Sequence, residues 1–245
     1  MGSYKFADRV FEIKNKYPYF AEFAREYASY EDAAAYSVEV SEDEILAENI
    51  DDAKGAALPY LETLAIYRKI AHLLASESCM LMHAAVIEYE GKAYAFTAKS
   101  GTGKTTHISL WEKVFGDKVT VVNGDKPLIR RREENGKTEF IAYGTPWSGK
   151  EGKNTNTGAP LAGICILERS PENYIRSAGD EAVPFLIGQL LIKEDAGYFS
   201  MLLDFLDTLV RSVPIYHLGV NMEDGAAITA RDGLLKKTYN EEKSV

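Results

Sequence analysis

A glycine-rich segment between Ala98 and Thr106 reads Ala-Lys-Ser-Gly-Thr-Gly-Lys-Thr-Thr. It follows an apolar segment, Lys92–Thr97, with the composition of a short strand. It leads into Thr105–Phe115, where apolar residues recur at helical spacing. A strand, a glycine-rich turn and a helix in this order are typical of a phosphate-binding loop, or P-loop. The segment therefore predicts an α/β fold built around a site for the phosphates of a nucleotide.

The residue types of this loop suit the binding of a polyphosphate. Glycines at positions 101 and 103 allow the backbone to turn so that successive N–H groups face one anion. Lys104 can reach the β- and γ-phosphates, and the Thr105 hydroxyl can bind Mg²⁺. Ala98 replaces the first glycine of the motif. The expected nucleotide contacts are Ser100, Gly101, Thr102, Gly103, Lys104, Thr105 and Thr106.

The composition excludes several classes of protein. The chain has 245 residues, 46% hydrophobic and 27% charged, enough to bury a full core as one domain or one domain with an appendage. Its net charge of −9 argues against nucleic-acid and anionic-membrane partners, because both favour a basic surface. No signal peptide or membrane-length apolar run is present, so we expect a cytoplasmic protein. Cys79 and Cys165 lie in apolar stretches and are expected as buried free thiols.

Two parts of the chain are expected, an N-terminal α/β cap at residues 1–78 and a nucleotide-binding domain at residues 79–245. In the cap, Ser41 and Glu44 have the spacing of a helix capping box. A long amphipathic helix is predicted over Pro59–Ser76, with the proline near its start. Other predicted elements are strands at Tyr36–Val40 and Ile215–Leu218 and helices at Ala182–Ile192 and Tyr198–Val210.

Strand register brings a histidine near the glycine-rich segment. Val86–Tyr89 and Lys92–Phe96 alternate in hydrophobicity around Glu90-Gly91, which predicts a two-residue hairpin. Counting back from this turn places His83 opposite Ala98. His83 is therefore a candidate for a role beside the phosphates. A histidine with a purely structural role at the start of a strand is the alternative.

A carboxylate follows the next strand. Val119–Val122 is a continuous β-branched run, typical of a strand buried on both faces of a parallel sheet, and it leads into Asn123-Gly124-Asp125-Lys126-Pro127. The carboxyl end of such a strand opens at the same sheet edge as the phosphate loop. Asp125 is therefore a candidate to bind Mg²⁺ together with Thr105, or to take a proton from an attacking hydroxyl. An Asx turn before Pro127 is the structural alternative.

A second hairpin directs the chain back to the same edge. Asn135-Gly136 is a strong type I′ turn signal between the predicted strands Leu128–Arg132 and Thr138–Tyr143. Continuing their register places Pro146 opposite Asp125. The loop that follows the second strand is therefore expected to return to the site.

The loop over Gly144–Asn156 carries groups suited to a ligand. Lys150 or Lys153 could neutralise phosphate charge, and Trp147 could cover a substrate or exclude water. Lys150 is taken as the candidate catalytic lysine. Lysines solvated on a surface turn are the alternative.

Together these segments resemble a known family. The order His83-Ala84, strand, Ser-Gly-Thr-Gly-Lys-Thr, helix, strand and Asn-Gly-Asp-Lys-Pro is similar to the catalytic domain of HPr kinase/phosphorylase, whose nucleotide fold is shared with phosphoenolpyruvate carboxykinase. The resemblance covers about residues 81–170, and the Gly144–Lys150 loop is similar to that of HPr kinase-like bacterial proteins. It implies an α/β P-loop fold with a mixed sheet and an ATP- and Mg²⁺-dependent phosphoryl transfer to a serine-type hydroxyl.

The resemblance also implies roles for single residues. At the matching positions Lys104 binds phosphate, Thr105 binds Mg²⁺ and His83 supports the acidic centre. Asp125 matches the second aspartate of the family's Asp-Asp pair, whereas Gly124 replaces the first, which is associated with base chemistry. The N-terminal part does not resemble the regulatory domain of HPr kinases, so HPr itself is not implied as the substrate.

The sequence therefore favours a kinase that transfers the γ-phosphate of ATP to a protein or peptide serine or to a small-molecule hydroxyl. Lys104 and Mg²⁺ would stabilise charge while Asp125 accepts or relays the proton. A non-catalytic ATP-binding switch is the alternative, favoured by Gly124. A carboxykinase is a third option, disfavoured because the chain is short and shows no evident oxaloacetate site. The acceptor, the residues that contact adenine and the oligomeric state stay open, and an oligomer is possible.

Overall fold

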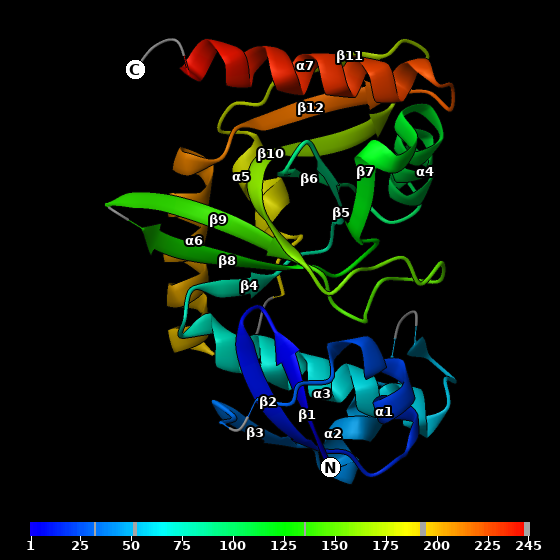
Figure 1. Ribbon diagram of the computed structural model, residues 1–245, viewed down its shortest axis with the longest axis vertical. Helices are drawn as coiled ribbons and strands as arrows, with labels where there is room; N and C mark the ends of the chain where they lie inside the picture. The colour runs from blue at the N-terminus through cyan, green and yellow to red at the C-terminus, as the bar shows by residue number, and fades with distance from the viewer. Residues whose placement is uncertain (32, 51–52, 135, 192–194, 243–245) are drawn as a thin grey trace.

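The structure, a computed structural model of the chain, describes residues 1–31, 33–50, 53–134, 136–191 and 195–242, with side chains as far as residue 236. Among these residues it is a mixed α/β protein with a three-stranded and a nine-stranded sheet. The small sheet lies at the end of the molecule opposite α7 (Gly225–Glu242), with the large sheet between them (Figure 1). Within the described part of the chain, no helix has the length and apolar character needed to cross a membrane.

The N-terminal part contains the small sheet and its covering helices. Strands β1 (Gly2–Phe6) and β2 (Arg9–Lys14) are antiparallel, and β3 (Tyr36–Glu39) adds in parallel to β2. The capping box is confirmed, because the Ser41 hydroxyl accepts from the Glu44 N–H and the Glu44 carboxylate accepts from the Ser41 N–H. The helices of this part are α1 (Tyr19–Phe23), α2 (Glu42–Ala47) and α3 (Leu58–Ala75).

The large sheet contains strands that run in both directions. Its order is β4-β8-β9-β10-β6-β5-β7, and β12 pairs with β10 and with β11. Strand β10 is parallel to β6 and β12 but antiparallel to β9, so it joins the β8–β9 hairpin to the strands beside the glycine-rich loop. The strands are β4 (Cys79–Leu81), β5 (Ala85–Tyr89), β6 (Lys92–Thr97), β7 (Val119–Asn123), β8 (Leu128–Glu134), β9 (Lys137–Tyr143), β10 (Gly158–Arg169), β11 (Tyr174–Ser177) and β12 (Ile215–Val220).

The pairing of β7 differs from the expectation. The sequence predicts a strand in parallel pairing, but β7 pairs antiparallel with β5, which in turn pairs antiparallel with β6. The cause is the two-residue turn at Glu90-Gly91, which folds β5 directly onto β6 and leaves its other edge for β7. Two antiparallel pairings restore the direction, so β6 and β7 still end at the same edge of the sheet.

The hairpin between β8 and β9 confirms the register predicted for it. The strands pair continuously from Leu128 with Tyr143 to Glu134 with Lys137. Gly136 has a φ of +75°, as a tight turn requires. Asn135, the other residue of the predicted turn, lies outside the described residues.

Helices cover both faces of the large sheet. Alternate residues of β5 and β6 belong to two separate hydrophobic clusters, one on each face. On one face α4 (Lys104–Phe115) packs with α7, and Trp111 is fully buried there. On the other lie α5 (Ala182–Ile187) and α6 (Ala196–Ser212). Cys79 and Cys165 are buried and free, as predicted.

Helix α5 is shorter than the expected helix at Ala182–Ile192. It ends at Ile187, with Gly188 as its C-cap, and the chain then turns beside β4, where Leu190 forms an isolated bridge with Met82. The apolar pattern continues past the helix because these residues pack against the sheet rather than form further helical turns. Ile192 lies outside the described residues.

One hydrophobic cluster joins the N-terminal part to the large sheet. It combines residues of β1, β2 and α3 with Leu128, Ile141 and Trp147. Trp147 is 4% exposed, its ring centroid lies 4.2 Å from that of Tyr67, and its indole N–H donates to the Thr63 carbonyl at 3.1 Å. The expectation that Trp147 covers a substrate is therefore wrong, because aromatic side chains of the N-terminal part enclose it.

We expect Trp147→Ala to lower the free energy of unfolding by about 3–5 kcal/mol, since it opens a cavity among aromatic rings and removes the bond to Thr63. Trp147→Phe should lose clearly less, because it keeps most of the packing. Urea denaturation followed by circular dichroism measures both variants. Unchanged stability of Trp147→Ala would show that this side chain does not hold the two parts together.

Candidate functional site

The glycine loop (residues 98–106) runs from the end of β6 into the first turn of α4. Gly101 and Gly103 have φ values of +76° and +123°, a backbone conformation that other residues rarely adopt. Helix α4 begins at Lys104, directly after Gly103, so its N-terminal N–H groups and the positive end of its dipole face the loop. Ala98, which replaces the first glycine of the motif, is fully buried and does not have a positive φ, so a methyl group fits there.

Arg169 holds the glycine loop in place. Its guanidinium donates to the carbonyl of Gly101 at 2.7 Å and to that of Thr102 at 3.2 Å. The Thr102 hydroxyl and N–H both donate to the Lys99 carbonyl, at 2.8 and 3.2 Å. These bonds fix the curvature of the loop. Arg169 was not predicted from the sequence, although it ends β10, the parallel neighbour of β6, and so belongs at the same sheet edge.

His83 lies between Lys104 and Asp125. Its Nε2 atom is 2.9 Å from Lys104 Nζ and 3.2 Å from Asp125 Oδ1. Beyond the paired part of β5, the Thr97 hydroxyl donates to the His83 carbonyl at 2.9 Å, and the His83 N–H donates to the Gln189 carbonyl at 2.7 Å. The hairpin register is therefore confirmed, and His83 lies beside the glycine loop as the count from the turn predicts.

Asn123 sets the position of Asp125. It is fully buried, and its side-chain oxygen accepts hydrogen bonds from the N–H groups of Asp125 at 2.8 Å and Lys126 at 2.7 Å. Its amide nitrogen donates to the Thr145 carbonyl at 2.9 Å. The side chain that forms the Asx turn in this segment is therefore that of Asn123. This positioning role of Asn123 was not predicted from the sequence. The Asp125 carboxylate is left for contacts with His83 and Lys126.

Gly124 packs directly against the long loop that returns from β9. A Cβ atom at this position would lie 2.7 Å from the Ser148 carbonyl oxygen and 3.4 Å from that of Lys153. The Gly124 N–H also donates to the Lys153 carbonyl at 3.0 Å. The position where the resembling family carries its first aspartate therefore has no room for a side chain in this arrangement.

Most of the candidate residues line one cavity of about 570 Å³, named here the first cavity. Its lining residues are His83, Ser100, Gly101, Gly103, Lys104, Thr105, Thr106, Gly124, Asp125, Lys126, Gly149, Lys150 and Glu151.

Two residues considered for a role with phosphate lie elsewhere. The Lys153 ammonium pairs with the Glu112 carboxylate of α4 at 2.5 Å. Thr102, a predicted nucleotide contact, lines a different cavity.

The first cavity is cationic although the chain carries a net charge of −9. Three lysines and a histidine line it against two carboxylates. Burial lowers the pKa of Lys104, and the neighbouring Asp125 carboxylate offsets part of this shift. Burial alone would raise the pKa of Asp125, but the hydrogen bond from His83 and the Lys126 ammonium lower it to about 2. Asp125 is therefore ionised throughout the physiological pH range.

The His83 Nε2 atom cannot serve both of its neighbours in the same way. It accepts a hydrogen bond when it faces the Lys104 ammonium, and it donates one when it carries a proton and faces Asp125. The cluster therefore has two proton arrangements. An anion that draws Lys104 away favours the arrangement in which His83 donates to Asp125.

No family model and no curated protein matches the sequence. Among solved structures, the chain is similar to the HPr(Ser) kinase/phosphatase from Coxiella burnetii, with a TM-score of 0.38 and 12% identity over 67% of this chain and 96% of that chain. A likeness of this size carries no argument about function.

Gly124→Ala should lower the free energy of unfolding by about 1–3 kcal/mol, because its Cβ forces the backbone at Ser148 to move. Gly188→Ala is the matched control: its Cβ would lie 3.4 Å from the nearest atom, the Phe185 carbonyl oxygen, which is ordinary contact. Thermal and urea unfolding compare the two variants. Equal stabilities would mean that the loop yields easily and that a side chain at position 124 is tolerated.

Proposed function

We propose that this chain is an ATP- and Mg²⁺-dependent kinase with a P-loop fold of the phosphoenolpyruvate carboxykinase/HPr kinase type, which transfers the γ-phosphoryl group to a hydroxyl. The observation that carries the proposal is the convergence of Lys104, His83 and Asp125 on one cavity beside the glycine loop. A loop suited to bind phosphate, a lysine cation and an ionised carboxylate are groups that phosphoryl transfer commonly uses. The protein would act in the cytoplasm, on a serine-type or small-molecule hydroxyl.

The glycine loop and α4 would bind the phosphates of ATP. Loop N–H groups and the start of α4 attract the β-phosphate, as at other helix N-termini. Lys104 would leave His83 for the β- and γ-phosphates, whose negative charge compensates the ammonium better than the His83 imidazole does. Lys150, an exposed lysine on the rim of the first cavity, would approach the γ-phosphate from the opposite loop.

Thr105 and Asp125 are the residues that would hold Mg²⁺. Both line the first cavity, and they offer one hydroxyl and one carboxylate. Mg²⁺ commonly takes one or two protein oxygens and completes its shell with phosphate oxygens and water, so this set fits. The ion would neutralise charge on the transferred phosphoryl group.

Asp125 would also orient the acceptor hydroxyl. A pKa of about 2 makes this carboxylate a weak base but a constant hydrogen-bond acceptor and metal ligand. Phosphoryl transfer has a loose transition state, in which positioning contributes more than early removal of the proton. With Lys104 on the phosphates, His83 would donate to Asp125 and keep the carboxylate in place.

A non-catalytic ATP-binding switch is the second candidate function. The packing of Gly124 against Ser148 favours it, because the family's first aspartate has no counterpart at that position. A screen with γ-labelled ATP against peptide and small-molecule hydroxyl acceptors separates the two candidates. Wild-type protein that binds ATP but transfers no phosphoryl group, to water or to any acceptor, would favour the switch.

ATP affinity should fall by about 100-fold or more in Lys104→Ala, because the variant removes the cation that faces two phosphates in a partly desolvated site. Lys99→Ala is the control, since Lys99 is an exposed lysine of the same loop that does not line the first cavity. Calorimetry with Mg-ATP measures both. Equal affinity in wild type and folded Lys104→Ala would refute the proposed phosphate site.

Phosphoryl transfer, or background ATP hydrolysis, should fall by about 10² or more in Asp125→Asn, with a much smaller loss of ATP affinity. Asp117→Asn, at an exposed aspartate, should leave both unchanged. An active Asp125→Asn enzyme would remove Asp125 from the mechanism.

His83→Ala should lower kcat with little change in ATP affinity, since it removes the donor that holds Asp125. Steady-state kinetics and calorimetry with Mg-ATP measure the two quantities. A His83→Ala variant that loses only thermal stability would mark His83 as structural.

A further inference from the structure

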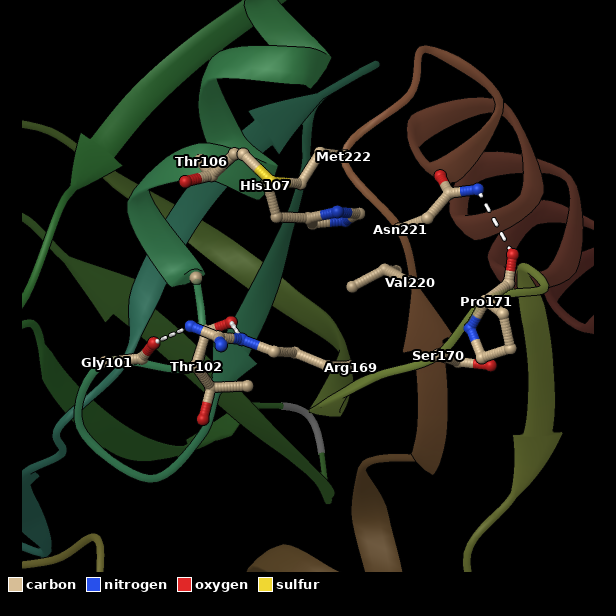
Figure 2. A pocket seen from close by; sticks show the side chains of 11 residues that line it. Gly101, Thr102, Thr106, His107, Arg169, Ser170, Pro171, Val220, Asn221 and Met222 are labelled. Carbon is tan, nitrogen blue, oxygen red and sulfur yellow. Dashed lines mark hydrogen bonds between the residues drawn. The ribbon is translucent and has the colours of Figure 1, made fainter.

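A second cavity, of about 530 Å³, adjoins the glycine loop (Figure 2). It shares Gly101, Gly103 and Thr106 with the first cavity but contains neither Lys104 nor Asp125. Its remaining wall comes from the segments that follow β10 and β12 and from the first turn of α4. The two cavities are thus neighbours that share part of the glycine loop, and Thr106 of α4 lines both.

His107 contributes a buried donor to this second cavity. Its side chain is 2% exposed, and its ring extends from α4 toward the Val220–Met222 segment (Figure 2). The Trp111 indole N–H, which can only donate, bonds to His107 Nε2 at 3.0 Å. The ring proton must therefore lie on Nδ1.

The Nδ1–H group of His107 has no hydrogen-bond partner among the described residues. A buried N–H without an acceptor is costly, and native structures seldom retain one without a reason. An acceptor on a bound ligand would satisfy it. The neighbouring wall can make room for such a ligand, because Met222 is 78% exposed and its side chain can move at little cost.

The order of residues along α4 indicates how a nucleotide would lie across the two cavities. Lys104 and Thr105 line the first cavity, Thr106 lines both, and His107 lines the second. A nucleotide with its β- and γ-phosphates at Lys104 would therefore pass Thr106 and place its base beside His107. Val220 and Met222 offer apolar contact to a flat ring, as base sites commonly do.

We propose that the second cavity binds the purine base of the nucleotide and that the His107 Nδ1–H group donates to a ring nitrogen of that base. The inference rests on the proposed function, because the phosphates must occupy the glycine loop. It assigns His107 a role in base recognition that the loop motif does not specify, since the motif fixes only the residues that contact phosphate. Val220 and Met222 provide apolar contact, whereas His107 provides a buried directional donor.

Deaza analogues of ATP test this contact without changing the protein. The binding of Mg-ATP, of its 1-deaza, 3-deaza and 7-deaza analogues and of inorganic tripolyphosphate would be measured by calorimetry. We expect ATP to bind at least tenfold more tightly than tripolyphosphate. We also expect one analogue to bind about tenfold more weakly than ATP, because the buried donor then loses its acceptor. Equal binding of ATP and all three analogues, or of ATP and UTP, would overturn the proposal.

Two variants locate the effect at His107. In His107→Phe the donor is absent, so ATP and the weak analogue should bind equally, and tripolyphosphate should bind as it does to wild type. In His107→Gln, whose amide can both accept from Trp111 and donate to the base, the preference for ATP should return in part. An undiminished preference for ATP over that analogue in folded His107→Phe would overturn the proposal.

The outcome with tripolyphosphate separates this inference from the proposed function. If tripolyphosphate binds in a Lys104-dependent manner but the base adds no affinity, the base site is wrong and the phosphate site stands. If tripolyphosphate does not bind, the proposed function fails, and the base site fails with it.

Discussion

Strand β5 lies between β6 and β7 and pairs antiparallel with both, and the whole site depends on this arrangement. Each pairing reverses the strand direction, so β6 and β7 run the same way and end at one edge. The glycine loop leaves β6 at that edge, and Asn123-Gly124-Asp125 leaves β7 there. The same hairpin carries His83 to the point where both segments meet. In a usual α/β sheet, β6 and β7 would end at one edge because they are parallel neighbours. Here they do so because the Glu90-Gly91 turn places β5 antiparallel between them.

Hydrogen bonds from neighbouring polar groups give these segments a defined geometry. Asn123 fixes the Asp125 backbone, and the Thr97 hydroxyl and the Gln189 carbonyl hold the His83 backbone. Arg169 does the same for the glycine loop. These bonds fix the backbone of the residues that carry or border the charged groups, so the groups are positioned before any ligand binds. The resulting cationic cavity can attract a polyphosphate to a chain whose overall charge is negative.

Packing also restricts which chemistry this site can use. Trp147 anchors the loop after β9 in the aromatic core of the N-terminal part, and the same loop then presses its Ser148 carbonyl against Gly124. A side chain at position 124 would have to displace a loop that the core holds in place. The lack of a side chain at position 124 is therefore tied to how the N-terminal part attaches to the sheet, and Asp125 is the carboxylate that lies beside His83 and Lys126.

The sequence by itself determined the local features: the glycine loop with its flanking strand and helix, both hairpin registers, the Ser41 capping box and the place of His83 beside the glycine loop. Each depends on residues close in the chain or on a count from a tight turn. Tertiary structure alone decided the antiparallel pairing of β7, the burial of Trp147, the bonds of Arg169 to the loop and the lack of space at Gly124. Those features depend on which distant surfaces meet, and that is set by the packing of the whole core rather than by any local pattern of residues.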